Sequence, residues 1–114
     1  MGRVYKILTA QDWSVAQAVG RFDGSAKDLA DGFIHLSTAA QAGETARLHF
    51  AGQAGLVLLA LDADALGAAL RWEPSRGGQM FPHLYGPLDP ALVVAVVPLP
   101  LDAEGMPQVG ALQP

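Results

Sequence analysis

The stretch Gly32-Phe33-Ile34-His35-Leu36-Ser37-Thr38-Ala39-Ala40-Gln41 decides how the rest of the chain is interpreted. Its apolar first half is short, which is typical of a buried β-strand. Its second half places a hydroxyl and a glutamine three residues apart, which is the spacing of a capping box at a helix N-terminus. We therefore predict a short strand over residues 33–36 and a helix over residues 39–50.

This junction places several polar groups side by side. On a strand, Phe33, His35 and Ser37 share one face, while Ile34 and Leu36 share the other. The unpaired amides of a helix N-terminus follow directly, and such amides can hold an anion or the polar edge of a ligand. The junction is therefore the first half of a predicted site that includes His35, Ser37 and Thr38.

A second segment, Phe81-Pro82-His83-Leu84-Tyr85-Gly86, carries the other half. Its His83 and Tyr85 have the same two-residue spacing as the first pair and share a strand face. Because Pro82 has no N–H to donate, a strand here is expected at the edge of a sheet. We predict that the two segments lie together and form one site.

The remaining sequence predicts further strands at residues 3–8, 56–61, 70–73 and 92–97, and a helix that starts after Thr9 and stops at Gly20. Residues 21–31 form a polar connector with a helical turn led by Ser25, and residues 62–66 a short helix. The predicted core consists of Ile7, Ile34, Leu36, Val57, Leu59, Val94 and Val96.

These elements predict an α+β fold with a mostly antiparallel, strongly curved sheet and short helices. A single domain over residues 1–99 is expected, followed by a tail rich in proline and glycine over residues 100–114, which we expect to be poorly ordered.

Composition narrows the class of protein. Of the 114 residues 51% are hydrophobic and 16% charged, and the net charge is −4, so the chain can build a core and does not favour nucleic-acid phosphates. There is no cysteine, and no apolar run approaches the ~20 residues that a membrane helix needs. We expect a cytoplasmic protein that binds neither nucleic acid nor membranes; its oligomeric state stays open.

Two standard kinds of site are disfavoured by spacing. The histidines His35, His49 and His83 match no zinc motif, so no metal site is expected. Ser37 lacks the nucleophile elbow of a serine hydrolase. Glu73, an acid in an otherwise apolar run, either pairs with Arg71 or Arg76 on the surface or lies near the histidines, where its charge would need a partner.

Several motifs taken together resemble a known family. They are Tyr5 with Trp13, Gly-Phe-Ile-His-Leu-Ser-Thr with Gln41, Trp72-Glu73, and Phe-Pro-His-Leu-Tyr-Gly-Pro-Leu from residue 81. Over nearly the whole chain to about Leu99, this pattern resembles the small bacterial domain-of-unknown-function 952 family, which implies no established activity.

The layout is also similar to the ADP-ribosyltransferase superfamily, and this resemblance implies a split pair of small antiparallel sheets. It implies that Tyr5 or Lys6 matches the early strand that contacts the nicotinamide ribose. The junction 35–38 would match the nicotinamide pocket, and Glu73 or the strand 83–85 the third element. The first strand departs from that superfamily, because it reads Lys6-Ile7-Leu8-Thr9 instead of carrying a His-Gly-Thr motif.

Two hypotheses about function follow. In the first, a pocket binds a nucleotide-like or phosphate-bearing small molecule, with NAD or ADP-ribose as candidates, and supports ADP-ribosyl-type chemistry. The candidate catalytic residues are His35, Glu73 and His83, and the candidate ligand-binding residues are Tyr5, Trp13, Ser37, Thr38 and Tyr85. In the second, the chain is a non-enzymatic interaction module whose histidines form a structural hydrogen-bond network.

Overall fold

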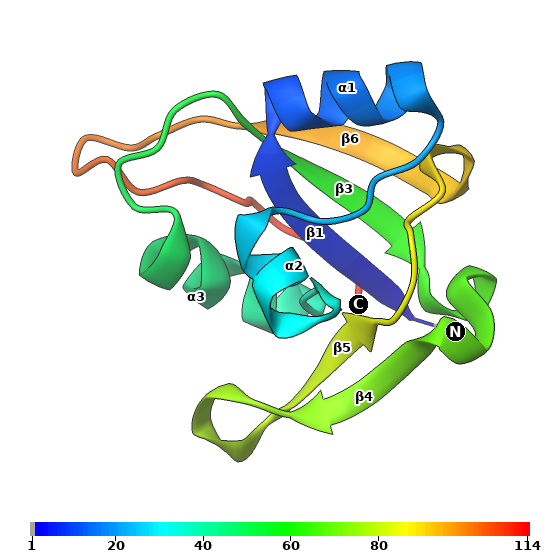
Figure 1. Cartoon of the computed structure of the whole chain (residues 1–114). Coiled ribbons are helices and arrows are strands. Elements are labelled where there is room, and N and C mark those ends of the chain that lie inside the picture. The colour runs from blue at the N-terminus through cyan, green and yellow to red at the C-terminus, as the bar shows by residue number, and fades with distance from the viewer. Residues whose placement is uncertain (1) are drawn as a thin grey trace.

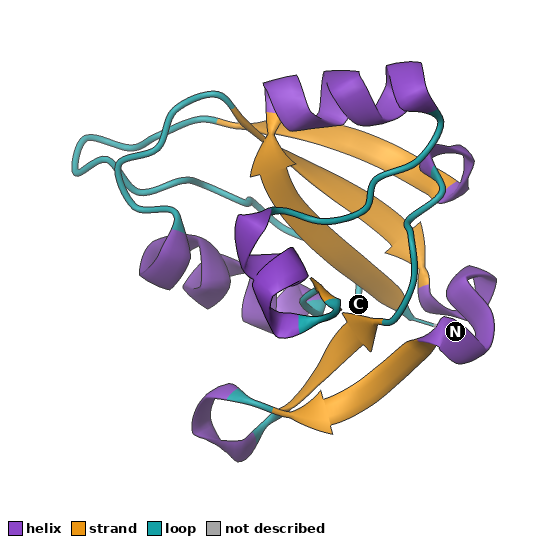
Figure 2. Ribbon diagram, viewed as in Figure 1, coloured by secondary structure: helices purple, strands orange, loops and turns teal. Residues whose placement is uncertain are grey.

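The structure is a computed structural model that describes residues 2–114. It is an α+β fold with two three-stranded sheets, ordered β1-β3-β6 and β2-β5-β4, in which every strand pair is antiparallel. In Figure 1 the first sheet runs diagonally beneath α1, and the β4–β5 hairpin lies below it. Figure 2 shows how short the helices are beside the strands.

The elements follow the predicted order closely. The strands are β1 (Arg3–Thr9), β2 (Ile34–His35), β3 (Leu56–Asp62), β4 (Leu70–Pro74), β5 (Met80–Leu84) and β6 (Val93–Leu99). The α-helices are α1 (Ala10–Val19), α2 (Ala26–Asp31) and α3 (Ala39–His49). Three 3-10 segments complete the chain: η1 (Ala63–Ala69), η2 (Arg76–Gly78) and η3 (Pro90–Leu92).

The helix starts are where the capping patterns place them. Thr9 Oγ1 accepts a hydrogen bond from the amide of Asp12 at 3.0 Å, and Gln41 Oε1 accepts one from the amide of Thr38 at 3.1 Å. The turn led by Ser25 is a full short helix, because Ser25 and Asp28 form a reciprocal capping box. Each pair satisfies amides that the first helical turn leaves without a partner.

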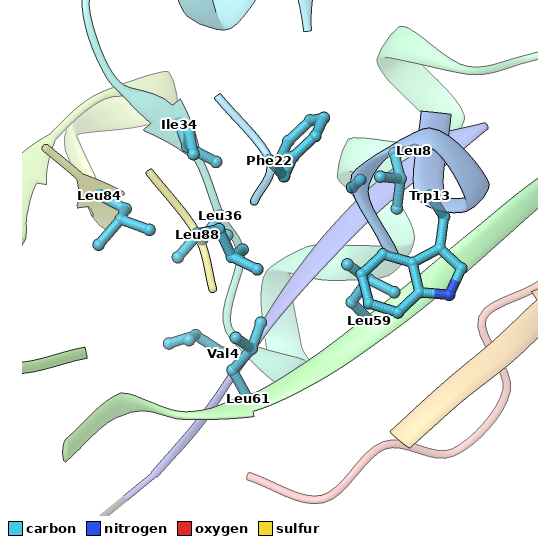
Figure 3. Close-up of a cluster of buried hydrophobic side chains, with 11 residues drawn as sticks. Val4, Leu8, Trp13, Phe22, Ile34, Leu36, Leu59, Leu61, Leu84 and Leu88 are labelled. Carbon is cyan, nitrogen blue, oxygen red and sulfur yellow. The ribbon is translucent and has the colours of Figure 1, made fainter. Parts of the chain in front are cut away.

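The main core lies between the two sheets. Figure 3 shows side chains from both sheets and from α1 meeting there, among them Trp13, Ile34, Leu59 and Leu84. The opposite face of the β1-β3-β6 sheet packs against α3 and the C-terminal tail through a second cluster that includes Tyr5, Ile7 and Leu58. β3 is consequently buried on both faces, as its continuous apolar run predicts.

The predicted core is correct except at β6. Ile7, Ile34, Leu36 and Leu59 are buried, and Val57 is partly buried against the main cluster. Val94 and Val96, however, are 49% and 43% exposed, so their assignment to the core is wrong. β6 is the outer strand of its sheet, and its middle residues are exposed although Leu99 at its end is buried. The run of β-branched residues therefore identifies a strand without fixing its burial.

The expected edge position of the Pro82 strand is also wrong. β5 lies between β2 and β4. The carbonyl of Pro82 accepts a hydrogen bond from the amide of Leu36 at 3.1 Å, so the missing N–H of Pro82 faces the same side. β2 pairs with β5 only through Ile34 and His35, so β2 ends before the position at which it would need an N–H group from Pro82.

The tail has no helix or named strand, but it makes defined contacts. Val109 and Leu112 pack against the second hydrophobic cluster, and the hydroxyl of Tyr5 donates a hydrogen bond to the carbonyl of Gln113 at 2.5 Å. These contacts differ from the expected poorly ordered tail. Within residues 2–114, no helix has the length and apolar character needed to cross a bilayer.

Candidate functional site

The two histidine segments do lie side by side. His35 on β2 is the register partner of His83 on β5, and their ring centroids are 5.8 Å apart. Phe33 stacks on His83 with a centroid distance of 4.0 Å and lies 4.6 Å from the ring of His35. The prediction that the segments meet is therefore confirmed, and Phe33 joins the two imidazoles into one ring cluster.

His35 is anchored from beneath by a buried ion pair. Asp28 on α2 accepts a hydrogen bond from His35 Nδ1 at 2.6 Å and another from the backbone amide of His35 at 3.0 Å. The ammonium of Lys6 on β1 lies 2.8 Å from the other oxygen of Asp28 and donates to the carbonyl of His35 at 3.1 Å. Lys6 and Asp28 are 5% and 2% exposed, so the two charges depend on each other.

Opposing effects set the pKa of each partner. Burial alone would raise the pKa of Asp28, but the hydrogen bond from His35 and the charge of Lys6 outweigh it and hold that pKa well below its ordinary value. Burial lowers the pKa of Lys6, and the nearby Asp28 carboxylate opposes this shift. Each charge thus offsets part of the cost of burying the other, and the pair supports β2 through its hydrogen bonds to His35.

The second nitrogen of His35 has a carboxylate partner as well. His35 Nε2 lies 2.9 Å from Asp31 Oδ2, at the C-terminal end of α2. A neutral imidazole has only one N–H, so both carboxylate contacts are hydrogen bonds only when the ring is an imidazolium. His35 thus lies between two carboxylates, one at each ring nitrogen.

His83 belongs to a separate hydrogen-bonded group. Its Nδ1 lies 2.8 Å from Glu73 Oε1 on β4, and the hydroxyl of Tyr85 donates to the same oxygen at 2.7 Å. These two hydrogen bonds, led by the one from His83, lower the pKa of Glu73, whereas the hydrogen bond to Glu73 raises the pKa of Tyr85. With Nδ1–H donating to Glu73, a neutral His83 carries its lone pair on Nε2.

Arg71 completes the outer side of this group. Its guanidinium lies 4.6 Å from the centroid of the Tyr85 ring, and Tyr85 lies 5.3 Å from Phe33. The side chain of Glu73 is 35% exposed, while His83 is buried under Phe33. Aromatic rings, a carboxylate and a guanidinium therefore lie next to one another on this face of the sheet. We call this surface the histidine face, and it consists of Phe33, His35, Arg71, Glu73, His83 and Tyr85.

The other predicted site residues have different surroundings. Ser37 is buried and its hydroxyl lies 3.0 Å from that of Thr45 on α3, while the backbone amide of Thr38 donates to Gln41. Tyr5 and Trp13 belong to the two hydrophobic clusters. The structure thus brings together His35, Glu73, His83 and Tyr85. The other four predicted residues contribute instead to the hydrophobic clusters and to the contacts of α3: Tyr5, Trp13, Ser37 and Thr38.

Asp28, Asp31 and Phe33 are absent from the sequence-predicted site. The signal for Asp28 was present, because Ser25 and Asp28 have the hydroxyl-x-x-acid spacing of a capped helix. That spacing predicts the hydrogen bond that Asp28 accepts from the Ser25 amide. It does not predict the hydrogen bonds that Asp28 accepts from Lys6 and His35. Phe33 lies on the face that strand alternation predicts for it, but an aromatic residue on a strand more often belongs to the hydrophobic core.

Cavities lie beside the histidine face and far from it. One of about 270 Å³ is bordered by Phe33, Asp28, Asp23 and Gly86, and so adjoins the ring cluster. A larger one of about 770 Å³ lies near Arg3, Asp62 and Gln113, away from the histidines. Among residues 2–114, no group of three potential ligands is arranged to hold a metal ion. The smaller cavity therefore lies at the edge of the histidine face, and the larger one is remote from it.

Comparisons with known proteins identify a family and similar solved structures. A family model described as "Protein of unknown function (DUF952)" matches residues 7–96. The crystal structure of CC0527 from Caulobacter crescentus is 58% identical, with a TM-score of 0.93 and 95% of each chain covered. The solution NMR structure of CC0527 has a TM-score of 0.87 at 58% identity, covering 96% of this chain and 95% of that one. No curated protein matches the sequence.

Proposed function

We propose, for a chain that belongs to the DUF952 family of proteins of unknown function, that the histidine face binds a small nucleotide-like molecule. The observation that carries this proposal is the shared use of Glu73 Oε1 by His83 and Tyr85. Within the described residues, no hydrogen bond goes to Oε2, although the side chain is 35% exposed. A carboxylate oxygen fixed in this way can accept a hydrogen bond from a ribose hydroxyl.

The rings support the base-like part of such a ligand. Phe33 and Tyr85 are partly exposed and lie 5.3 Å apart, so a planar heterocycle has aromatic surface on which to stack. Arg71 lies over Tyr85 and offers hydrogen-bond donors to an anionic group. Stacking together with a fixed carboxylate is a combination that suits a nucleoside better than a simple anion.

The finer proposal concerns chemistry and fold. The split pair of antiparallel sheets supports an ADP-ribosyltransferase-like fold. In ADP-ribosyl-type chemistry the histidines would hold ribose or phosphate oxygens, and Glu73 would orient the attacking group. The partner in this proposal is a small molecule in the cytoplasm, such as NAD or ADP-ribose, and neither a nucleic acid nor a membrane.

The test is an amide NMR titration with ADP-ribose, NAD and inorganic phosphate. Binding at the histidine face predicts shifts concentrated on residues 33–35, 71–73 and 81–86. Glu73→Gln, which keeps the shape and removes the charge, should weaken ADP-ribose binding by about tenfold, or ~1.4 kcal/mol. Glu44→Gln, on the exposed side of α3, is the matched control and should leave binding unchanged. Absence of shifts at millimolar ligand would contradict the proposal.

One observation favours the non-enzymatic alternative for part of the network. Lys6 and Asp28 are buried and make several hydrogen bonds with β2, which is the arrangement of a structural polar core. His35→Ala separates the two roles. A large loss of stability with unchanged ligand binding would assign His35 to the structural network, whereas retained stability with lost binding would assign it to the ligand site.

A further inference from the structure

Asp31 and Asp28 hold His35 in very different ways. Asp28 is 2% exposed and accepts four hydrogen bonds, from Lys6, Ser25 and both the ring and backbone of His35. The Asp31 side chain is 40% exposed and contacts His35 Nε2 at 2.9 Å and Lys27 at 3.3 Å. One carboxylate is fixed in the core, and the other lies on the surface over the open nitrogen of the ring.

The position of Asp31 allows it to leave that nitrogen. It is the last residue of α2 and precedes Gly32, whose φ of 87° ends the helix. Lys27, one turn earlier and itself 61% exposed, already pairs with Asp31 and would keep its charge compensated after it left His35. Exposed ion pairs of this kind contribute little to stability, so exchanging one for another costs little.

We propose that the Asp31 carboxylate is a built-in stand-in for an anionic group of the ligand, which displaces it and binds His35 Nε2. The geometry identifies the group as an oxyanion, and within the proposed nucleotide ligand this is a phosphate. This inference rests on the proposed function and adds the group that His35 recognises. Asp31 then has a defined role: it keeps His35 Nε2 partnered when the ligand is absent and competes with weak anions.

Charges from every neighbouring element act on this position. α2 supplies Asp28 and Asp31, β1 supplies Lys6, and β5 supplies His83. His49 on α3 interacts with His35 through its charge over a longer distance. Lys6 and Asp28 neutralise each other, so removing the charge of Asp31 leaves His35 Nε2 without its surface anion.

Sulfate is a suitable probe because its charge is constant between pH 5 and pH 8. We would titrate the full chain with sulfate and follow the ring nitrogens of His35 by NMR. Asp31→Asn should bind sulfate about tenfold more tightly than the wild type, or ~1.4 kcal/mol.

Asp62→Asn is the matched control. Asp62 is also an exposed aspartate paired with a cation, Arg3 on β1, so its substitution removes the same charge without uncovering His35. Equal sulfate affinity in the two variants, or sulfate shifts away from His35, would overturn the inference. Asp31→Ser repeats the test with a different side chain in case the first variant folds poorly.

The two proposals can fail separately. If ADP-ribose binds in a Glu73-dependent manner while Asp31→Asn does not strengthen sulfate binding at His35, the role of Asp31 is wrong and the nucleotide site stands. If Asp31→Asn binds sulfate at His35 while ADP-ribose moves no amide resonance, the anion position stands and the nucleotide proposal is wrong.

Discussion

At the scale of single residues, the pair of Lys6 and Asp28 carries the largest consequence for stability. The two charges lie 2.8 Å apart and are nearly excluded from water. Such a pair adds little compared with an apolar pair of similar size, but losing one partner strands the other charge. The same Asp28 positions His35, so stability and the site share one carboxylate.

Asp28→Asn is therefore expected to lower the free energy of unfolding at pH 7 by about 3–5 kcal/mol, because Lys6 keeps a buried charge without a counter-ion. Urea denaturation measures this. Asp23→Asn, in an exposed pair, should change stability by no more than about 0.5 kcal/mol. A loss below about 1 kcal/mol for Asp28→Asn would show that the pair is not isolated from water.

The pH dependence of this variant has a definite sign. Because the pKa of Asp28 is lower in the folded protein than in the unfolded chain, its contribution is complete above about pH 5 and is lost as the pH falls toward the folded pKa. The stability difference between wild type and Asp28→Asn should consequently narrow as the pH is lowered from 5 to 2.

At the scale of elements, local signals specify the helices well. Thr9, Ser25 and Thr38 each begin a helix, and glycine ends two of them, at Gly20 and Gly32. Capping depends on residues three or four apart, so a sequence contains the whole interaction. The burial of β6 and the central position of β5 depend on which strands become neighbours, and no local pattern carries that information.

Two glycines test whether local backbone preferences determine the stability of the helices. Gly43 lies inside α3, where an added Cβ would meet Val109 at an ordinary contact distance of 3.8 Å, so Gly43→Ala should stabilise the protein by about 0.5–1 kcal/mol. Gly32→Ala should destabilise it by about 1 kcal/mol, because φ is 87° there. Urea midpoints that moved in the same direction for both variants would contradict this account.

At the scale of the whole molecule, the site is made by elements that are distant in sequence. The proximity of His35 and His83 could be predicted from the sequence, because each is followed two residues later by a polar residue on the same strand face. The meeting of Lys6, Asp28 and Asp31 at His35 could not be predicted, since it requires β1 and α2 to come together beside β2. The sequence predicts the imidazoles and Glu73 as candidates, and only the fold shows which carboxylate holds which ring.

The tail is a whole-molecule feature with a measurable effect. Deletion of residues 108–114 removes Val109 and Leu112 from the second cluster together with the Tyr5–Gln113 hydrogen bond. We expect the free energy of unfolding to fall by about 2–4 kcal/mol, visible as a lower Tm by circular dichroism. Tyr5→Phe, which removes only the hydrogen bond, should cost about 1 kcal/mol. An unchanged Tm after deletion would mean that the tail contacts contribute nothing.

The pairing of β2 with β5 has a consequence for how such a protein can diversify. Ile34 and Leu84 are register partners and both enter the core, while His35 and His83 are register partners on the other face. Alternate positions on these two strands thus serve different purposes: one set stabilises the core and the other forms the histidine face. Substitutions on one set can change what the protein recognises while the other set preserves the fold, so relatives with this scaffold can share their interior and differ in their chemistry.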